Sequence, residues 1–479
     1  MKVLAIDQGT TATKAFTYDE EGTFSKIASF EHKQFYPQAG WVEHDAEELL
    51  KNIKICIKQA GVVDAIGIAN QGETIVAWDS ETGKPLYPAI VWQDDRTKDV
   101  TSRLRAEGHE ALTQAKAGLP LDSYFSASKM RWILDHVEAA RELLKLGRLR
   151  MGTSDAFFLD RLTSTFVTDV TTASRTSLMS LDTLQWDEEL CALFGVPIEC
   201  LPDIKSTTGA FGLFKKIPVT ANVVDQQAAL FGHGCMKPGD AKITFGTGAF
   251  ALALSGPQRP PKNQFGLLPT VAWRMQGEAA LFAVDGGIYN AASAVNWAKS
   301  LGLFSDYTEI NAFKTETAIS RGLVFVPALS GLAAPHWDRQ ASGLWLGLGL
   351  ETTKQDMMQA VLEGVALRAA EVVQAMGKLG ASGTSGIKGG FMSIDGGLAA
   401  NPYFGQFLAN ALNRKVIVAA TADLTALGCA RMALLGAGAK YLPPLPASHQ
   451  SYAPLDPISA AHHARFSIAI IRAKGWKNF

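Results

Sequence analysis

Three short apolar runs separated by turn residues open the chain. They predict strands at residues 3–6, 14–18 and 24–30. A glycine and threonine turn at residues 9–11 joins the first two, and an acidic turn at residues 19–22 joins the second and third. The chain therefore begins with a small antiparallel meander.

A helix and a further strand follow this meander. Asp45 is a good N-cap, and Glu48 three residues later completes a pattern typical of a capping box. Apolar residues then recur at helical spacing as far as Gly61, and residues 62–69 predict a buried strand. This order predicts an α/β unit that differs from the strict strand–helix alternation of a dinucleotide-binding domain.

The same strand–turn–strand pattern returns halfway along the chain. Residues 240–245 and 249–254 predict two strands joined by a second glycine and threonine turn. Pro and Gly interrupt the pattern just before it, at residues 236–239, which marks a candidate boundary. We therefore expect an N-terminal lobe at residues 1–236 and a C-terminal lobe at residues 237–479. Near the end, a Pro-rich stretch that precedes a terminal helix predicts a connector.

Composition excludes several classes of protein. Hydrophobic residues make up 47% and charged residues 19%, which is typical of a folded chain and not of a disordered one. The net charge is −1, so we expect no nucleic-acid partner and no membrane surface as partner. No apolar segment of signal-peptide or membrane-spanning length is present, and the 5 cysteines lack zinc or disulfide spacing. We expect a cytoplasmic protein.

The first turn carries candidate phosphate chemistry. Asp7 ends the first strand, and the turn that follows offers backbone N–H groups with the hydroxyls of Thr10 and Thr11. Phosphate oxygens accept hydrogen bonds from such groups, while a carboxylate holds Mg²⁺ directly or through water. Lys14 could reach a phosphate. Alternatively, the turn is a plain hairpin and Lys14 is a solvated strand residue.

Two further glycine turns lie in the second half of the chain. One contains Thr247, and the other, at residues 394–397, is followed by Asn401 at the start of a predicted helix. Glycines there allow a nucleotide base or ribose to lie against the backbone. Together with the first turn, they suggest a nucleotide clamped in a cleft between the lobes.

A polar and aromatic group completes the candidate chemistry. It contains Glu73, Trp92, Tyr124, Asp225 and Gln226. Carboxylates and amides suit a hydroxyl-rich ligand, and aromatic rings suit its C–H faces. Asp225 opens an apolar helix, so it is either a general base or simply an N-cap. Glu73 and Trp92 could equally be a surface carboxylate and a core aromatic.

Longer blocks of sequence give a specific resemblance. The chain resembles the FGGY family of carbohydrate kinases, and among them most of all the glycerol kinases. The blocks that carry the resemblance are residues 40–45, 70–74, 83–94, 118–126, 225–232 and 395–401, with two family signatures at 124–136 and 343–363. Matching blocks extend from residue 3 to about residue 438.

The resemblance implies an α/β fold of two actin-like, ribonuclease-H-type lobes with ATP and a polyol or sugar between them. It implies an ATP-dependent kinase in which Asp225 is the catalytic base and Asp7 lies near Mg²⁺. The matching nucleotide contacts are Thr10, Thr11, Thr247, Gly397 and Asn401, with Lys14 and Asn296 as further candidates. The matching polyol pocket is Glu73, Trp92, Tyr124, Asp225, Gln226 and Phe250. Asn296 and Ala292 stand where glycerol kinases usually carry Gln and Gly. A homodimer is expected on the resemblance alone.

One departure concerns the acceptor. Glycerol kinases usually have arginine where this chain has Gly72, and that arginine donates hydrogen bonds to glycerol hydroxyls. Its loss removes donors, at a cost of about 1–3 kcal/mol per unpaired hydroxyl, and is expected to open space. We therefore hypothesise an acceptor larger than glycerol, such as a four- or five-carbon polyol or ketose. The alternative is a true glycerol kinase despite Gly72.

Two other classes of function share the expected fold. An actin-like ATP-dependent scaffold or chaperone would use the nucleotide turns, but it has no need of the polar and aromatic group around Asp225. A sugar-responsive repressor would need a DNA-binding segment, and the sequence starts directly with the first strand. The kinase hypothesis accounts for both sets of residues.

Overall fold

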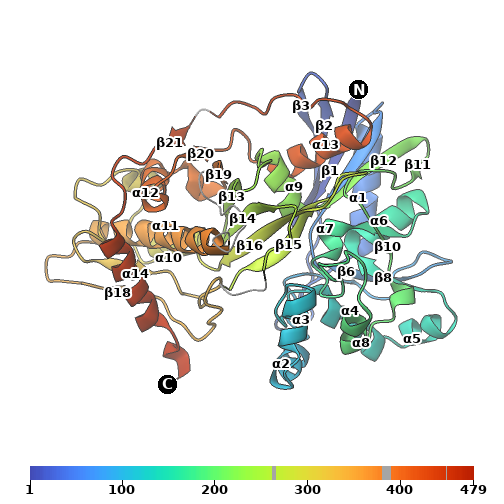
Figure 1. Ribbon diagram of the computed structural model, residues 1–479, viewed down its shortest axis with the longest axis horizontal. Helices are drawn as coiled ribbons and strands as arrows, with labels where there is room; N and C mark the ends of the chain where they lie inside the picture. Colours follow the sequence, from blue (N-terminus) through green and yellow to red (C-terminus); the bar gives the residue numbers. More distant parts are fainter. Residues whose placement is uncertain (262–265, 380–389, 449, 479) are drawn as a thin grey trace.

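The computed structural model describes residues 1–261, 266–379, 390–448 and 450–478. Two sheet-containing lobes lie side by side, with the N-terminal elements in one and most of the C-terminal elements in the other (Figure 1). The structure is mixed α/β, as the sequence predicted.

The sheet of the N-terminal lobe has six strands in the order β11-β12-β5-β1-β2-β3. The three strands of the predicted meander are β1 (Lys2–Gln8), β2 (Ala12–Asp19) and β3 (Phe24–Glu31). Strands β1, β5 (Ala65–Asn70) and β12 (Ile217–Val224) run parallel, and β11 (Leu213–Phe214) forms the edge. The meander is confirmed, with each strand slightly longer than predicted.

The first helix and its N-cap follow the prediction, but the capping box is not completed, because Glu48 accepts a hydrogen bond from the backbone N–H of Lys33 instead. Helix α1 (Ala46–Gln59) begins after Asp45, whose carboxylate accepts hydrogen bonds from the backbone N–H groups of Glu47 and Glu48. Gly61 has a φ of 70°, in the left-handed region that ends helices. The next strand begins at Ala65 and not at residue 62, because Val62 is exposed in the connection.

The sheet of the C-terminal lobe has seven strands in the order β15-β16-β14-β13-β19-β20-β21. Its strands are β13 (Ala241–Phe245), β14 (Ala249–Gly256), β15 (Leu268–Trp273), β16 (Leu281–Ile288), β19 (Met392–Asp395), β20 (Val416–Val418) and β21 (Ser451–Tyr452). The predicted connector at residues 442–457 contains β21, which pairs with β20.

Both lobes repeat one topology. In each, three antiparallel strands are followed by two strands parallel to the first. The spatial order is β3-β2-β1-β5-β12 in one lobe and β16-β14-β13-β19-β20 in the other. This is the ribonuclease-H-type arrangement, and its duplication gives the actin-like fold expected from the resemblance.

The remaining elements cover and extend these sheets. The helices are α2 (Lys98–Ala106), α3 (Glu110–Lys116), α4 (Ser126–His136), α5 (Glu138–Lys145), α6 (Ser154–Thr163), α7 (Val170–Ala173), α8 (Glu188–Phe194), α9 (Asp225–Gly232), α10 (Ala292–Ser300), α11 (Lys354–Leu379), α12 (Pro402–Leu412), α13 (Leu424–Gly436) and α14 (Ala460–Ala473). The other strands are β4 (Glu43–His44), β6 (Ile75–Asp79), β7 (Ala89–Ile90), β8 (Leu149–Thr153), β9 (Val167–Asp169), β10 (Asp203–Lys205), β17 (Val324–Val326) and β18 (Leu344–Leu346). Short 3-10 turns lie at Ile198–Cys200, Tyr307–Ile310, Gly397–Ala400 and Trp476–Asn478.

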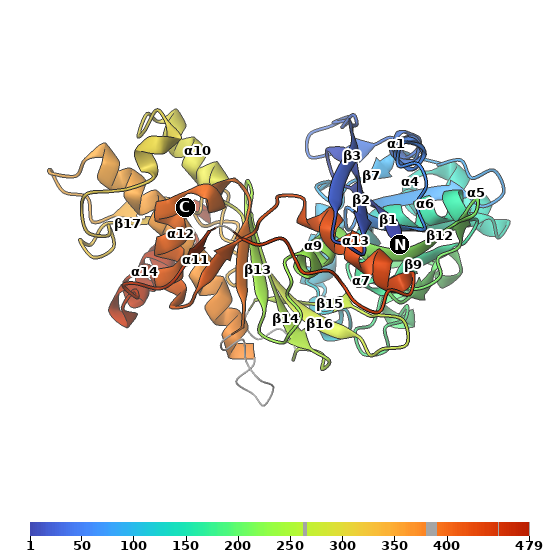
Figure 2. The same cartoon turned by 90° about the horizontal axis from the view of Figure 1, so that it is seen from above.

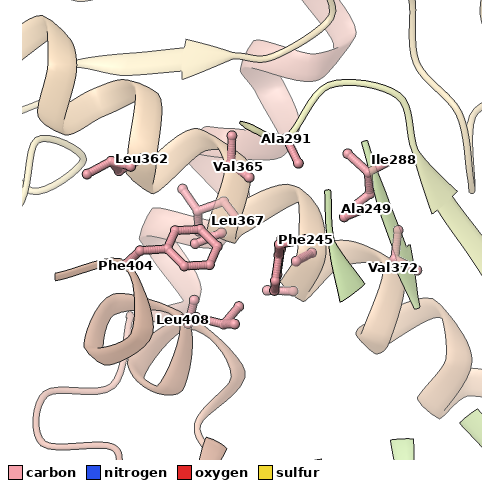
Figure 3. Packing of buried hydrophobic residues seen from close by; sticks show 14 of the residues in the cluster. Phe245, Ala249, Ile288, Ala291, Leu362, Val365, Leu367, Val372, Phe404 and Leu408 are labelled. Atoms are coloured by element: carbon pink, nitrogen blue, oxygen red, sulfur yellow. The ribbon is translucent and has the colours of Figure 1, made fainter. Parts of the chain in front are cut away.

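The C-terminal lobe buries its core between the sheet and helices α11 and α12. Figure 3 shows Phe245 and Ala249 of the sheet facing Leu367 and Val372 of α11, with Phe404 of α12 closing the layer. These side chains are buried, so the apolar face of the sheet fixes the position of the glycine turn that follows β13.

Helix α13 comes from the C-terminal half of the sequence but packs against the N-terminal lobe. Figures 1 and 2 both place it beside β1 and α9. Its apolar residues share a buried cluster with Val3 and Ala5 of β1 and Leu230 of α9. The chain therefore returns to the first sheet before its end. Among the described residues, no helix has the length and apolarity needed to cross a bilayer.

Candidate active site at the carboxyl ends of the parallel strands

The three parallel strands of the N-terminal lobe bring the two key carboxylates to one sheet edge. Gln8, Asn70 and Val224 form a row across β1, β5 and β12. Asp7 precedes this row and Asp225 follows it, so both lie at the carboxyl edge, on strands that are second neighbours. Strands are about 4.8 Å apart, which puts the two backbones about 10 Å apart.

Asp225 is the first residue of α9 and not its N-cap. Val224 occupies the N-cap position, and the Asp225 carboxylate accepts a hydrogen bond from the N–H of Gln226 at 2.6 Å. The N-cap interpretation of Asp225 is therefore wrong. The carboxylate lies at the positive end of a helix that begins at the strand edge.

A cavity of about 150 Å³ lies against this edge. All of the residues predicted to bind the polyol line it, together with Thr10. The lining residues are Thr10, Gly72, Glu73, Trp92, Tyr124, Arg175, Val224, Asp225, Gln226, Gln227, Phe250, Leu252 and Asp285. The structure thus brings together residues as far apart in the sequence as Thr10 and Asp285.

The aromatic side of the cavity is held by polar contacts. The indole Nε1 of Trp92 donates to Thr10 Oγ1 at 3.0 Å, and its ring meets that of Tyr124 edge-on at 5.5 Å. The ammonium of Lys129 donates to the backbone carbonyl of Tyr124 at 2.7 Å. These contacts join the first turn to the cavity wall and fix the rings.

An ion pair that the sequence analysis missed lies in the cavity wall. Arg175 follows α7, and its Nε donates to Glu73 Oε1 at 2.7 Å while its Nη2 lies 3.3 Å from Asp285 Oδ2. Glu73 follows β5 with a φ of 59°, and Asp285 belongs to β16 of the other lobe. Because these residues come from three distant segments, local sequence patterns give no signal for the contact.

The sequence predicted that Gly72 opens space in the acceptor site, but the structure shows that a neighbouring side chain takes up part of this space. A Cβ atom at this position would lie 2.8 Å from Cγ2 of Val224. Contacts below about 3 Å force a neighbour to move, so the Val224 side chain already occupies part of the room next to Gly72. Val224 therefore restricts the space for a side chain at position 72, and both residues line the cavity.

Burial and neighbouring charges raise the pKa of the two edge carboxylates. Burial raises the pKa of Asp225 to about 7, and the negative charges of Glu73 and Asp7 act in the same direction. Burial also raises the pKa of Asp7 to about 6, against the lowering effect of the Lys14 ammonium. A carboxylate with a pKa near 7 is suited to accept a proton at neutral pH.

Lys242 of β13 is a buried cation beneath the cavity. Its ammonium donates to Gln226 Oε1 and to Thr244 Oγ1, the latter at 3.1 Å. Its charge lowers the pKa of Asp225. Because Gln226 lines the cavity and Thr244 precedes the second glycine turn, Lys242 connects the two predicted binding regions.

The first turn is also held from several sides. His32 Nε2 contacts the carbonyl oxygen of Thr10 at 2.8 Å. Lys14 forms a partly exposed ion pair with Asp423 at 3.1 Å. Thr11 lies in the turn between β1 and β2 and is exposed, so a ligand can reach its hydroxyl.

The glycine turns of the C-terminal lobe lie at one edge, because Thr244 of β13 pairs with Asp395 of β19. Thr247 is exposed, and its carbonyl accepts a hydrogen bond from Ala291 N at 3.0 Å. Gly396 has a φ of 90° and lies against the backbone of Phe245, so a side chain would not fit. A Cβ at Gly397 would meet no atom within 4 Å, so there is open space beside this residue.

The two predicted asparagine contacts are placed differently. Asn401 is the N-cap of α12: its Oδ1 accepts from Phe404 N at 2.8 Å and its Nδ2 donates to Ile310 O at 2.9 Å. Its amide is therefore engaged in holding the helix. Asn296 is exposed on α10 and accepts a hydrogen bond from the hydroxyl of Tyr307 at 2.8 Å.

The donor set fits Mg²⁺ better than a metal that needs several protein ligands. Within the described ranges, no group of three or more His, Cys, Asp or Glu side chains could hold an ion. Mg²⁺ is commonly bound by one or two carboxylates, waters and substrate phosphates. The buried Asp7 carboxylate beside a threonine-rich turn matches that pattern.

Comparison with known proteins places the whole chain in one family. The model of the FGGY carbohydrate kinase N-terminal domain matches residues 2–232, and that of the C-terminal domain matches residues 241–437. Glycerol kinase from Thermus brockianus is 41% identical over 495 aligned residues, covering 99% of both chains. Glycerol kinase from Xanthomonas euvesicatoria is 39% identical, covering 91% of this chain and 90% of the relative.

Solved structures agree with this result. The ADP complex of Plasmodium falciparum glycerol kinase superimposes with a TM-score of 0.90 at 31% identity, covering 98% of each chain. Xylulose kinase from Rhodospirillum rubrum has a TM-score of 0.84 at 23% identity, covering 98% of this chain and 99% of the other, and shares the fold. The chain therefore belongs to the FGGY family of carbohydrate kinases, which are phosphotransferases with an alcohol group as acceptor.

Proposed function

We propose that this protein transfers the γ-phosphoryl group of ATP to a hydroxyl of an uncharged polyol or sugar, with Asp225 as the general base. The observation that carries the proposal is the position of Asp225, in the wall of the acceptor cavity and at the same sheet edge as Asp7. The named relatives are glycerol kinases, which act on a polyol.

Asp225 accepts the proton of the attacking hydroxyl as the new O–P bond forms and the bond from the γ-phosphorus to the bridging oxygen breaks. Its raised pKa suits this task near pH 7. Lys242 orients Gln226 beside the base through its hydrogen bond. Positioning and charge stabilisation supply most of the acceleration in such transfers.

The nucleotide is held between the lobes in this proposal. Thr10, Thr11 and Lys14 of the first turn and Thr247 of the second face the phosphates, and the open backbone at Gly397 supports the nucleoside. Asp7 would hold Mg²⁺, and the bound ion would neutralise charge on the phosphate oxygens. We assign acceptor binding chiefly to residues 1–236 and nucleotide binding chiefly to residues 237–479.

The acceptor is uncharged and, we propose, longer than glycerol. Three carboxylates and one guanidinium line the cavity, so an acceptor that bears its own carboxylate is disfavoured. The carboxylates can accept hydrogen bonds from the hydroxyls of an uncharged acceptor. Because position 72 is glycine, the arginine that binds glycerol hydroxyls in glycerol kinases is absent, which favours an acceptor other than glycerol. Glycerol remains the alternative acceptor because the relatives at about 40% identity are named glycerol kinases.

A coupled ADP-release screen of the purified protein tests the proposal. The panel contains glycerol, erythritol, D-threitol, xylitol, ribitol, D-xylulose, D-ribulose and D-gluconate. We expect ADP release with at least one uncharged four- or five-carbon compound to exceed that with glycerol and gluconate. If glycerol is phosphorylated best, the alternative holds and the proposed acceptor size is wrong. If no acceptor stimulates ADP release, the kinase assignment of the cavity is wrong.

The compartment and the oligomeric state are finer proposals. All 5 cysteines are buried thiols without a disulfide, which is consistent with the reducing cytoplasm that we propose. The homodimer stays a prediction from the resemblance.

A further inference from the structure

Arg175 contacts two carboxylates that line the acceptor cavity and come from different lobes. Glu73 follows β5 in the N-terminal lobe, and Asp285 lies on β16 in the C-terminal lobe. All three side chains line the cavity, and of the three only Glu73 affects the proton transfer assigned to Asp225, because its charge raises the pKa of that base. The proton transfer therefore does not explain why Arg175 and Asp285 line the cavity.

Unused hydrogen-bonding capacity remains in this pair. Arg175 is buried, and among the described residues its Nη1 has no hydrogen-bond partner. A buried donor without a partner is costly, which implies a ligand or water that accepts from it. The Asp285 side chain is 17% exposed against 6% for Arg175, so it is the more open member of the pair.

The pair also joins the two lobes at the cavity. Asp285 reaches Arg175 across the lobe boundary, whereas Glu73 and Arg175 belong to the same lobe. A hydroxyl beside this contact would accept a hydrogen bond from Nη1 of Arg175 and donate one to the Asp285 carboxylate. A small acceptor already held at Glu73 and Asp225 would leave this place to water.

We propose that Arg175 and Asp285 form a hydroxyl subsite that binds a hydroxyl beyond the three carbons of glycerol and so selects a longer uncharged polyol or ketose. This inference rests on the proposed phosphoryl transfer in the same cavity. It makes Asp285 a specificity-determining residue and Arg175 both a donor to the acceptor and the group that holds Glu73 and Asp285 in place.

The test compares acceptors within each enzyme. Asp285→Asn keeps the size of the side chain but removes its charge and one acceptor atom. We expect kcat/KM for erythritol or xylitol, whichever the wild-type enzyme uses better, to fall by about 10- to 100-fold. We expect kcat/KM for glycerol to fall by a smaller factor, because glycerol does not reach the subsite and is affected only through the contact of Arg175 with Glu73. Glu278→Gln, on the exposed turn before β16, is the matched control and should change neither value.

An equal fall for both acceptors would overturn the subsite, because a purely structural role of Asp285 affects every acceptor alike. If the asparagine variant does not fold, the acceptor preference of Asp285→Glu provides a second test. Its extra methylene fills part of the subsite, so the preference should shift towards glycerol, and an unchanged preference contradicts the proposal.

Calorimetric titration of erythritol, xylitol and glycerol into wild-type and variant proteins repeats the comparison without catalysis. The subsite requires the variant to lose more affinity for the longer polyol than for glycerol. The acceptor panel with the wild-type protein tests the proposed function. The subsite is tested by the ratio of variant to wild-type kcat/KM for each acceptor, so either proposal can be contradicted without the other.

Discussion

At the scale of single residues, the protonation state of Asp225 controls the proposed chemistry. Burial, Glu73 and Asp7 all raise its pKa, to about 7, so the protonated form dominates in more acidic solution. A protonated carboxyl cannot accept the hydroxyl proton. Activity must therefore fall as the pH drops through the pKa of the folded enzyme.

The pH dependence of kcat/KM should show this directly. We expect an acid limb with an apparent pKa near 7, and Glu73→Gln should move the limb to lower pH because one neighbouring negative charge is removed. ATP ionises identically in both assays, so the difference between the two profiles belongs to the protein. Superimposable limbs would show that Glu73 does not act on the titrating group.

Gly72 and Val224 form a second residue-scale test. Gly72→Arg alone should lose activity, because even its Cβ would crowd Val224. Combined with Val224→Gly, the arginine should fit, and the ratio of kcat/KM for glycerol to that for erythritol should rise by about 10- to 100-fold over wild type. Acceptor kinetics of the four enzymes in a double-mutant cycle measure the coupling, which we expect to be about 0.5–3 kcal/mol. Additive effects would mean that the two positions do not share space.

At the scale of elements, α9 carries Asp225 and is held by close packing on α13. Gly232 and Gly428 let the two helix backbones approach, since a Cβ at Gly428 would overlap the carbonyl oxygen of Ala228. Gly428→Ala should therefore separate the helices and lower the free energy of unfolding by about 1–3 kcal/mol. It should also lower kcat, because α9 moves with its carboxylate.

Gly377→Ala on α11 is the control for this substitution. A Cβ there meets no atom within 4 Å, so alanine should stabilise the helix by about 0.5–1 kcal/mol. Chemical denaturation and steady-state kinetics of both variants check the pair. Equal stabilities for the two variants would argue against tight packing of α9 on α13.

Local patterns predicted elements well and tertiary contacts poorly. The meander, α1 and the repeated glycine turns follow from periodicity, capping and turn residues, which act between near neighbours in the chain. The polyol residues were predicted from the family resemblance, and they do line one cavity. Arg175, Asp285 and the contact of Val224 with Gly72 depend on segments brought together only by folding. The same reason explains why the packing of α13 on the first lobe was not foreseen.

At the scale of the whole molecule, the two lobes enclose a larger cleft of about 680 Å³. Helices α2 and α3 of the N-terminal lobe line one side, and Tyr289, Trp337 and Arg339 of the C-terminal lobe line the other. Arg339 and Asp122 face each other across it at 4.0 Å. Such an exposed pair contributes little energy, so bound ligands are expected to govern lobe closure.

Thermal unfolding can detect this coupling between lobes. MgADP and the preferred acceptor should each raise the melting temperature, by an amount equivalent to about 2.7 kcal/mol when the ligand is present at 100 times its Kd. Added together, they should stabilise the protein by more than the sum of the two effects, because each ligand favours the closed lobes. Strictly additive shifts would mean that the two sites act independently.

The most direct test of the central claim is phosphoryl transfer by Asp225→Asn. Rapid-quench measurement with MgATP and the best acceptor should show a loss of about 10²- to 10⁴-fold in the transfer rate, the usual contribution of a general base. Calorimetry should give an ADP affinity within about 3-fold of wild type. A transfer rate within 10-fold of wild type, or a loss of ADP affinity as large as the loss of rate, would contradict the assignment of Asp225 as the base.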